Sequence, residues 1–178
     1  MKLSTAQIGR CGELLVQYEL LARGVESAPM STDTGIDLVT YSSASAQPAT
    51  VQVKTVFAAK PGGGKGALLL DWWVPSTTPA QLVALVDMST PRIWLFTRSE
   101  LIEAAQQQPT SGLLHFFMKV SPSRRPRADG KAQDIQDFER FRLERRMAEL
   151  FGDDGHQARD GLVPPALAEP AGAVEPGE

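Results

Sequence analysis

The chain has 178 residues, of which 42% are hydrophobic and 22% charged, a composition typical of one soluble globular domain. No stretch approaches the roughly 18 apolar residues of a membrane span, and the N-terminus lacks the apolar core of a signal peptide, so we expect a cytoplasmic protein without a membrane partner. The net charge is −3, and one cysteine with two histidines can form neither an internal disulfide nor a Cys/His zinc site, so any metal ion must bind oxygen ligands.

The first third of the chain predicts one helix and then extended segments. Ser4 or Thr5 caps a helix that Gly24 ends, and its apolar residues recur at three- and four-residue spacing at positions 8, 11, 14, 15, 18 and 21. Residues 25–30, 35–41 and 49–57 are predicted strands. Residues 42–48 form the loop that joins the last two strands into a hairpin.

The remainder of the body predicts further strands and two helices. The strands cover residues 67–74, 82–88, 92–97 and 113–120, and the second and third are compact apolar runs of the kind found in the centre of a sheet. Helices are predicted over residues 99–108 and 132–151. This order of elements predicts an α/β fold with a central mixed β-sheet.

Charge divides the chain into a body and a tail. Residues 152–178 contain six acids and one base in a Pro-, Gly- and Ala-rich stretch without apolar periodicity, so we expect an acidic, disordered tail. The body, residues 1–151, has 17 bases and 15 acids. Within it, residues 119–146 have nine bases and five acids, which favours an anionic partner if they share a face and is otherwise an ordinary solvated surface.

Two loops carry candidate contacts to nucleic acid. The stretch KPGGGKG, residues 60–66, is not a phosphate-binding P-loop, because Lys60 stands where the first glycine is needed and Gly66 follows Lys65. We interpret it as a mobile hairpin loop whose Lys65 can touch nucleic acid. The second loop, SPSRRPRADGK, offers the best candidates for phosphate contacts, which are Arg124, Arg125 and Arg127.

Aromatic residues are assigned mainly to the core. Trp94 lies inside an apolar strand and is expected to be buried, and His115 between Leu114 and Phe116 is expected to be packed. Adjacent Trp72 and Trp73 must point to opposite sides of their strand, so one of them can be exposed and able to stack on a base.

The hairpin over residues 35–57 predicts a polar cluster. Its loop is centred on Ser45, so antiparallel pairing sets Asp37 level with residues 52–54, and Gln52 and Lys54 share one face of their strand. If no bulge turns Asp37 away, a carboxylate, an amide oxygen and an ammonium converge. Such a group suits phosphodiester hydrolysis assisted by Mg²⁺. The alternative is a half-exposed strand whose Gln52 and Lys54 face solvent.

The first helix carries a further carboxylate, Glu13, on the side shared with Gly9, Val16 and Leu20. Gly9 and Gly12 each cost a helix about 1 kcal/mol relative to alanine, so we expect a sheet or a phosphate backbone to approach closely there. The same packing would let Glu13 reach the hairpin. The alternative is an exposed glutamate beside helix-end glycines.

Three motifs in this order resemble the PD-(D/E)xK nuclease superfamily: Gly-x-x-Gly-Glu ending at Glu13, Gly-Ile-Asp ending at Asp37, and Gln-x-Lys-Thr starting at Gln52. The chain is most similar to small Holliday-junction-resolvase-like and intron-encoded members that carry Gln in place of the second acid. The resemblance implies a restriction-endonuclease-like fold with an αβββαβ core, a central mixed sheet flanked by helices. It implies Asp37 as principal metal ligand, Gln52 as the substitute for the acid, Lys54 as catalytic lysine, Glu13 as the helix-borne carboxylate and the Val53 carbonyl as a further ligand.

The function that the resemblance implies is a metal-dependent endonuclease acting on DNA. Its cofactor is Mg²⁺, or Mn²⁺ in its place, and by analogy with the fold it acts as a homodimer. Because Gln52 is neutral, the site has one negative charge fewer than most of the superfamily and should hold its metal more weakly. Two alternatives stay open: a weak or inactive nuclease-fold module that binds nucleic acid or a protein, and an interaction protein without a nucleic-acid role.

Overall fold

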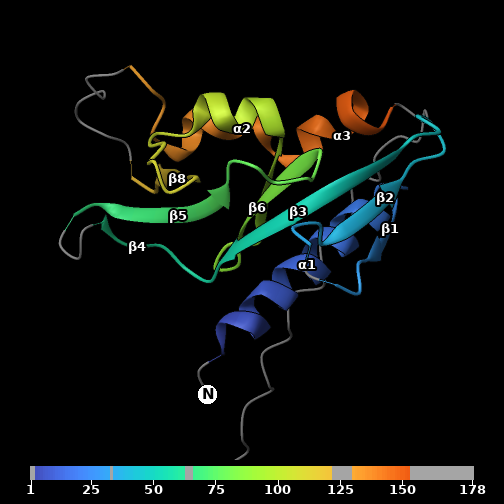
Figure 1. Cartoon of the computed structure of the whole chain (residues 1–178), viewed down its shortest axis with the longest axis horizontal. Helices are drawn as coiled ribbons and strands as arrows, with labels where there is room; N and C mark the ends of the chain where they lie inside the picture. The colour runs from blue at the N-terminus through green and yellow to red at the C-terminus, as the bar shows by residue number, and fades with distance from the viewer. Residues whose placement is uncertain (1–2, 33, 63–65, 122–129, 153–178) are drawn as a thin grey trace, which may run out of the picture.

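A computed structural model describes residues 3–32, 34–62, 66–121 and 130–152 of the chain (Figure 1). The predicted tail, apart from Gly152, lies outside the described residues. Among the described residues, no helix is both long and apolar enough to cross a membrane.

The centre of the molecule is a five-stranded mixed sheet in the order β1-β2-β3-β6-β7. Its strands are β1 (Glu26–Pro29), β2 (Leu38–Tyr41), β3 (Pro48–Val56), β6 (Leu82–Asp87) and β7 (Arg92–Thr97). All neighbouring pairs are antiparallel except β3 and β6, which are parallel. Helices α1 and α2 lie on opposite sides of this sheet (Figure 1). The predicted α/β class, with a central mixed sheet flanked by helices, is confirmed.

The connection from β3 to β6 passes through two further strands rather than through a helix. These are β4 (Lys60–Pro61) and β5 (Leu68–Pro75), which with β8 (Leu113–Lys119) form a second sheet in the order β4-β5-β8. The strands predicted at 67–74 and 113–120 are therefore present but belong to a separate sheet. The glycine-rich loop joins antiparallel β4 and β5, as its interpretation as a hairpin loop requires.

Each face of the central sheet has its own apolar core. On one face, Val83 and Leu85 of β6 pack with Trp72 and Phe116 of the second sheet and with Leu101 of α2 (Arg98–Ala104). On the other face, Val51 and Val53 of β3 pack with Val16 and Leu20 of α1 (Thr5–Leu21). Trp94 is fully buried, as predicted.

The sheet approaches α1 closely on its glycine side, as predicted, but at Gly12 and not at Gly9. Ser4 caps the helix in a capping box with Gln7, as the sequence indicates. The helix buries Gly12, Val16 and Leu20, while three residues of the apolar period, Leu14, Tyr18 and Leu21, are exposed at 51%, 61% and 58%. The reason is the closeness of the sheet, because a Cβ atom at Gly12 would overlap Thr55 of β3. Only the side of the helix that has a glycine there can approach so closely.

The two predicted C-terminal helices are shorter or broken. The single helix predicted over 132–151 is a 3₁₀ helix, η2 (Ile135–Phe141), followed by α3 (Leu143–Phe151). The break lies at Arg142, whose extended backbone (ψ 135°) forms a β-bridge with Trp94 on the edge strand β7. Helix α2 ends before the predicted residue 108, because the Gln106 side chain is buried and binds the backbone of Phe117.

Candidate functional site at the end of strand β2

Asp37 immediately precedes Leu38, the first residue of β2. Beyond this point β3 continues along the sheet without β2 as its neighbour. Leu38 is level with Val51 in the strand pairing. The backbone N–H of Asp37 donates to the carbonyl of the same Val51 at 2.9 Å. Two successive residues of one strand therefore lie opposite one residue of the other, which is the arrangement of a β-bulge. The backbone N–H of Val53, two residues after Val51 on β3, has no β2 residue opposite it. It donates instead to Oδ2 of the Asp37 carboxylate, at 2.6 Å. Asp37 is therefore a neighbour of Val53 across the strands, as predicted, but a bulge lies at this position, and the convergence of Asp37 with Gln52 and Lys54 stays a prediction.

The residue before Val53, Gln52, has a buried amide whose oxygen has no partner among the described residues. Gln52 is 3% exposed, and its Oε1 accepts no hydrogen bond from the residues that the structure describes. A buried acceptor without a hydrogen bond destabilises the folded state by about 1–3 kcal/mol, so the Gln52 oxygen is available to a ligand that can reach it. The N–H and C=O of one strand residue point to the same side of the strand, so the Val53 carbonyl faces the same sheet edge as Asp37.

The segment that leads into Asp37 is fixed by a loop that sequence reasoning missed. Gly35 has a left-handed φ of 82°, and a Cβ atom there would lie 3.1 Å from Cδ of Pro79 and 3.6 Å from Nε2 of Gln52. The hydroxyl of the buried Thr78 donates to the Gly35 carbonyl at 3.5 Å. The glycine before Asp37 is a visible signal for such a close approach, but Thr78 and Pro79 are brought near it only by the fold.

Lys54 lies on the same face of β3 as Gln52, two residues further along. It is half-buried and level with Leu85 of β6. Within the described ranges, its ammonium group forms no hydrogen bond or ion pair. A charged group that is neither paired nor fully hydrated can bind an incoming anion.

Glu13 of α1 lies apart from Asp37, Gln52 and Lys54, next to the face of β3 that Thr55 points to. It follows Gly12, which contacts Thr55, and Thr55 points to the opposite face of β3 from Lys54. The Glu13 carboxylate forms an ion pair with Arg10 at 2.7 Å. Among the described residues, no contact joins Glu13 to Asp37, Gln52 or Lys54. The spacing of Arg10 and Glu13 by three helix positions is a signal for this pair that sequence reasoning did not use.

The four predicted nucleic-acid contacts, Lys65, Arg124, Arg125 and Arg127, lie outside the described residues. Within the described part of the chain, no three His, Cys, Asp or Glu side chains gather as a metal site. The donors at the end of β2 are instead one carboxylate, one amide oxygen and one backbone carbonyl. These are hard oxygen ligands, which suit a Mg²⁺ ion that keeps several waters.

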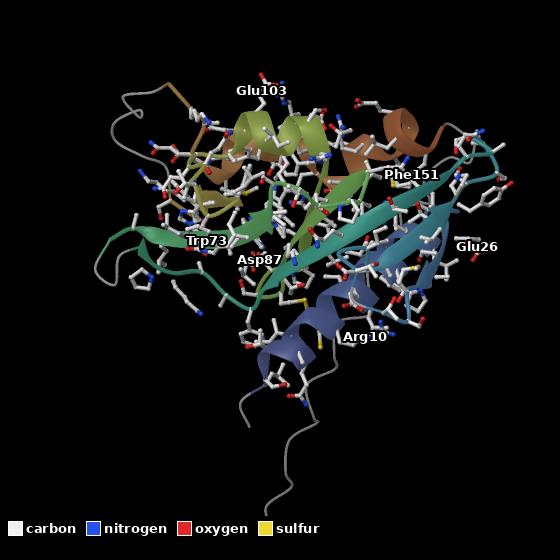
Figure 2. The ribbon with its side chains drawn as sticks, viewed as in Figure 1. Arg10, Glu26, Trp73, Asp87, Glu103 and Phe151 are labelled. Carbon is white, nitrogen blue, oxygen red and sulfur yellow. The ribbon has the colours of Figure 1, made fainter. Side chains whose placement is uncertain are left out.

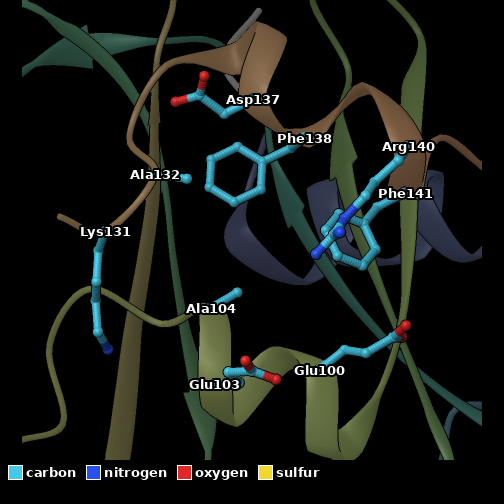
Figure 3. A pocket seen from close by; sticks show the side chains of 9 residues that line it. All are labelled: Glu100, Glu103, Ala104, Lys131, Ala132, Asp137, Phe138, Arg140 and Phe141. Atoms are coloured by element: carbon cyan, nitrogen blue, oxygen red, sulfur yellow. The ribbon is translucent and has the colours of Figure 1, made fainter. Parts of the chain in front are cut away.

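A separate cavity of about 190 Å³ lies between α2 and η2 (Figure 3). Phe138 and Phe141 line it together with charged residues that already have partners. For example, Glu100 pairs with Arg146 at 2.8 Å, and Asp137 accepts hydrogen bonds from two backbone N–H groups. The cavity contains none of the predicted site residues.

Comparison with known proteins gives weak likenesses. No family model and no curated protein matches the sequence. Among solved structures, the chain is similar to the bacterial homing endonuclease I-Ssp6803I, with a TM-score of 0.47 and 15% identity over 72% of this chain and 88% of that chain. It is also similar to MepB, with a TM-score of 0.29 and 12% identity over 72% of this chain and 89% of that chain. Neither likeness assigns a function to this chain.

Proposed function

We propose that the protein is a metal-dependent endonuclease that hydrolyses phosphodiester bonds in DNA. The observation that carries the proposal is the group at the end of β2: the Asp37 carboxylate on the Val53 N–H, and the adjacent Gln52 and Lys54 of β3, whose side-chain oxygen and ammonium have no partner among the described residues. These are the residues on which the sequence resembles the PD-(D/E)xK nucleases. The physical features and the motif therefore point to the same chemistry.

Asp37, Gln52 and the Val53 carbonyl would hold the Mg²⁺ or Mn²⁺ ion. When bound, this ion makes water a better nucleophile at neutral pH and offsets negative charge on the phosphate. Asp37 is held in its orientation by the Val53 N–H before the substrate arrives. Gln52 contributes an oxygen that is already removed from water in the folded state, so metal binding does not include the free-energy cost of dehydrating it.

Lys54 acts on the substrate. Its Nζ donates hydrogen bonds to a phosphate oxygen, where negative charge grows in the transition state, or it orients the attacking water. The resemblance also gives Glu13 a place in the site, but in this structure Glu13 pairs with Arg10 on the side of β3 opposite to Lys54, so α1 would have to shift as well as release Arg10. A partly exposed ion pair of this kind contributes only about 0–1 kcal/mol, so the release of Arg10 costs little.

The test compares Asp37→Asn and Lys54→Ala with the unaltered chain on duplex, branched and single-stranded DNA, in Mg²⁺ and in EDTA. Asparagine keeps an oxygen that can accept from the Val53 N–H, so the fold is preserved while the charge is lost. We expect each variant to cleave at least about 100-fold more slowly. Asp137→Asn is the matched control, because that carboxylate also accepts backbone N–H groups but lies on η2. Undiminished cleavage by both site variants would remove the assignment.

One observation favours a second function, a nuclease-fold module that binds nucleic acid or a protein without cutting. The neutral Gln52 gives the group at the end of β2 a single carboxylate, which weakens its hold on a cation. Thermal unfolding with increasing Mg²⁺ separates the two functions, because a ligand that binds the folded state raises its stability. DNA binding without a metal-dependent rise in Tm and without cleavage supports the module.

A further inference from the structure

The outer face of the β4-β5-β8 sheet carries an exposed aromatic pair. Trp73 of β5 is 46% exposed, and its indole stacks on the imidazole of His115 of β8 with ring centroids 4.1 Å apart and parallel planes. The other two tryptophans, Trp72 and Trp94, are buried at 2% and 0%. Figure 2 labels Trp73 on β5, and because its neighbour Trp72 points into the core, Trp73 points to the opposite side of this sheet. The exposed indole is thus distinct from the aromatic core.

The imidazole that supports the indole is held in place at both ring nitrogens. Nε2 lies 3.3 Å from the Asp71 carboxylate and Nδ1 lies 3.2 Å from the side-chain oxygen of Gln107. The backbones of Gln107 and His115 also exchange two hydrogen bonds. The orientation of the aromatic pair is therefore fixed before any ligand binds, which reduces the entropy cost of binding.

On the side of the indole away from His115, the neighbouring strand β4 does not reach Trp73. Strand β4 pairs only with Leu68 and Leu69, so no residue of β4 lies opposite Trp73. A flat aromatic ring with one face supported and the other accessible is the arrangement that stacks on an unpaired nucleobase.

Cationic side chains follow on the same face. Lys60 of β4, Leu69 of β5 and Lys119 of β8 are level with one another across the three strands. Leu69 is four residues from Trp73, so this row shares the face of the indole at a distance of about 13 Å along the strand. Lys60 is exposed, and Lys119 is oriented by a hydrogen bond to Gln133 at 2.9 Å. The one acid between them, Asp71, faces His115.

The aromatic pair and the lysine row also lie close to the candidate active site along the chain. Lys60 follows Lys54 by six positions, which limits the distance between their backbones to about 20 Å. This separation is within the length of a short nucleic-acid strand.

We propose that Trp73 stacks on an unpaired base of single-stranded or branched nucleic acid while Lys60 and Lys119 bind the phosphates of the same strand. This inference rests on the proposed function, because it names the substrate class of that site: nucleic acid with unpaired bases rather than an intact duplex. Sequence analysis allowed one of the adjacent tryptophans to be exposed; the structure identifies which one and what supports it.

The experiment uses the full chain in EDTA at low salt. Trp73 is the exposed one of the three tryptophans, so its fluorescence reports on ligand stacking. We expect a 12-nucleotide oligothymidylate to quench the emission, and an abasic strand of equal length and charge to quench it far less. By anisotropy of a labelled strand, Trp73→Ala weakens binding of oligothymidylate by about 10- to 100-fold. We expect the affinity of Trp73→Ala for a blunt duplex to equal that of the unaltered chain.

Two further variants keep the result interpretable. Tyr41→Ala removes another half-exposed aromatic side chain, on β2, and should not alter the affinity. Trp73→Phe keeps a smaller ring and gives an intermediate affinity, and far-UV circular dichroism checks that each variant is folded. Equal affinities of Trp73→Ala and the unaltered chain for oligothymidylate overturn the inference, as does equal quenching by the abasic strand.

The binding assay also separates this inference from the proposed activity. Asp37→Asn should bind oligothymidylate as tightly as the unaltered chain while its cleavage is lost. If the chain binds through Trp73 but cleaves nothing in Mg²⁺, the proposed activity fails and the stacking site stands. If cleavage depends on Asp37 but neither affinity nor substrate preference depends on Trp73, the stacking site fails and the activity stands.

Discussion

The contact between α1 and β3 can be tested by replacing each of two neighbouring helix glycines with alanine. At Gly12, a Cβ atom would overlap Oγ1 of Thr55 and lie 2.9 Å from both its Cβ and its Cγ2. At Gly9, a Cβ atom meets nothing within 4 Å. Both substitutions improve helix propensity by the same amount, so they differ only in this contact.

The magnitudes follow from these two terms. Glycine to alanine in a helix interior stabilises by about 1 kcal/mol, and this is the whole effect expected for Gly9→Ala. Overpacking a tight contact costs about 1–3 kcal/mol, since α1 must move away and loosen Val16 and Leu20 against the sheet. Gly12→Ala should therefore be less stable than Gly9→Ala by about 1–3 kcal/mol. In a domain of this size, each kcal/mol shifts Tm by about 2–4 °C.

The assay is urea unfolding of both variants, each also made in a Thr55→Ala background. Oγ1 of Thr55 has no hydrogen-bond partner among the described residues, so Thr55→Ala removes the overlapping atoms without breaking a bond. Part of the cost of Gly12→Ala should then disappear, while the effect of Gly9→Ala stays the same. Equal stabilisation by the two alanines in the chain that keeps Thr55 would refute the close approach of α1 to β3.

Three further changes have defined outcomes. Gln52→Glu sets a second carboxylate beside Asp37, so Tm should be lower than that of the unaltered chain in EDTA and should rise more steeply with Mg²⁺; an identical Mg²⁺ response would contradict the metal site. Gly35→Ala must adopt a φ of 82°, so it should lower the free energy of unfolding by about 1–2 kcal/mol and slow cleavage by displacing Asp37; full activity would show that this glycine does not position the site. Burial acts to raise the pKa of Asp87, but hydrogen bonds from Ser89, Thr90 and Arg92 outweigh it and hold that pKa below its usual value of 3.8. The Asp87 carboxylate therefore stabilises the fold above about pH 4, and this contribution is lost as the pH falls through the folded pKa. Asp87→Asn should cost about 1.5–3 kcal/mol at pH 7 and less at pH 3, and equal costs in urea unfolding at the two pH values would exclude this linkage.

Much of the local structure could be predicted from the sequence, because it depends on neighbours along the chain. Alternating and compact apolar runs locate the strands, and the capping box at Ser4 locates the start of α1. The loop between β2 and β3 sets Asp37 beside Val53, because a hairpin register follows from counting residues outward from its turn. The central part of the candidate site is therefore a local property of one hairpin.

The tertiary structure alone decided which surfaces meet. The apolar period of α1 favoured the side of Leu14 and Tyr18, whereas the glycine pair favoured the side of Gly12, and only the structure shows that the sheet packs at Gly12. Arg142 interrupts a helix that its neighbours favour, because its backbone bridges the edge of β7. The pairing of Glu13 with Arg10 and the support of Trp73 by His115 likewise depend on how side chains are finally placed, since periodicity records which residues are apolar but not how near another element comes.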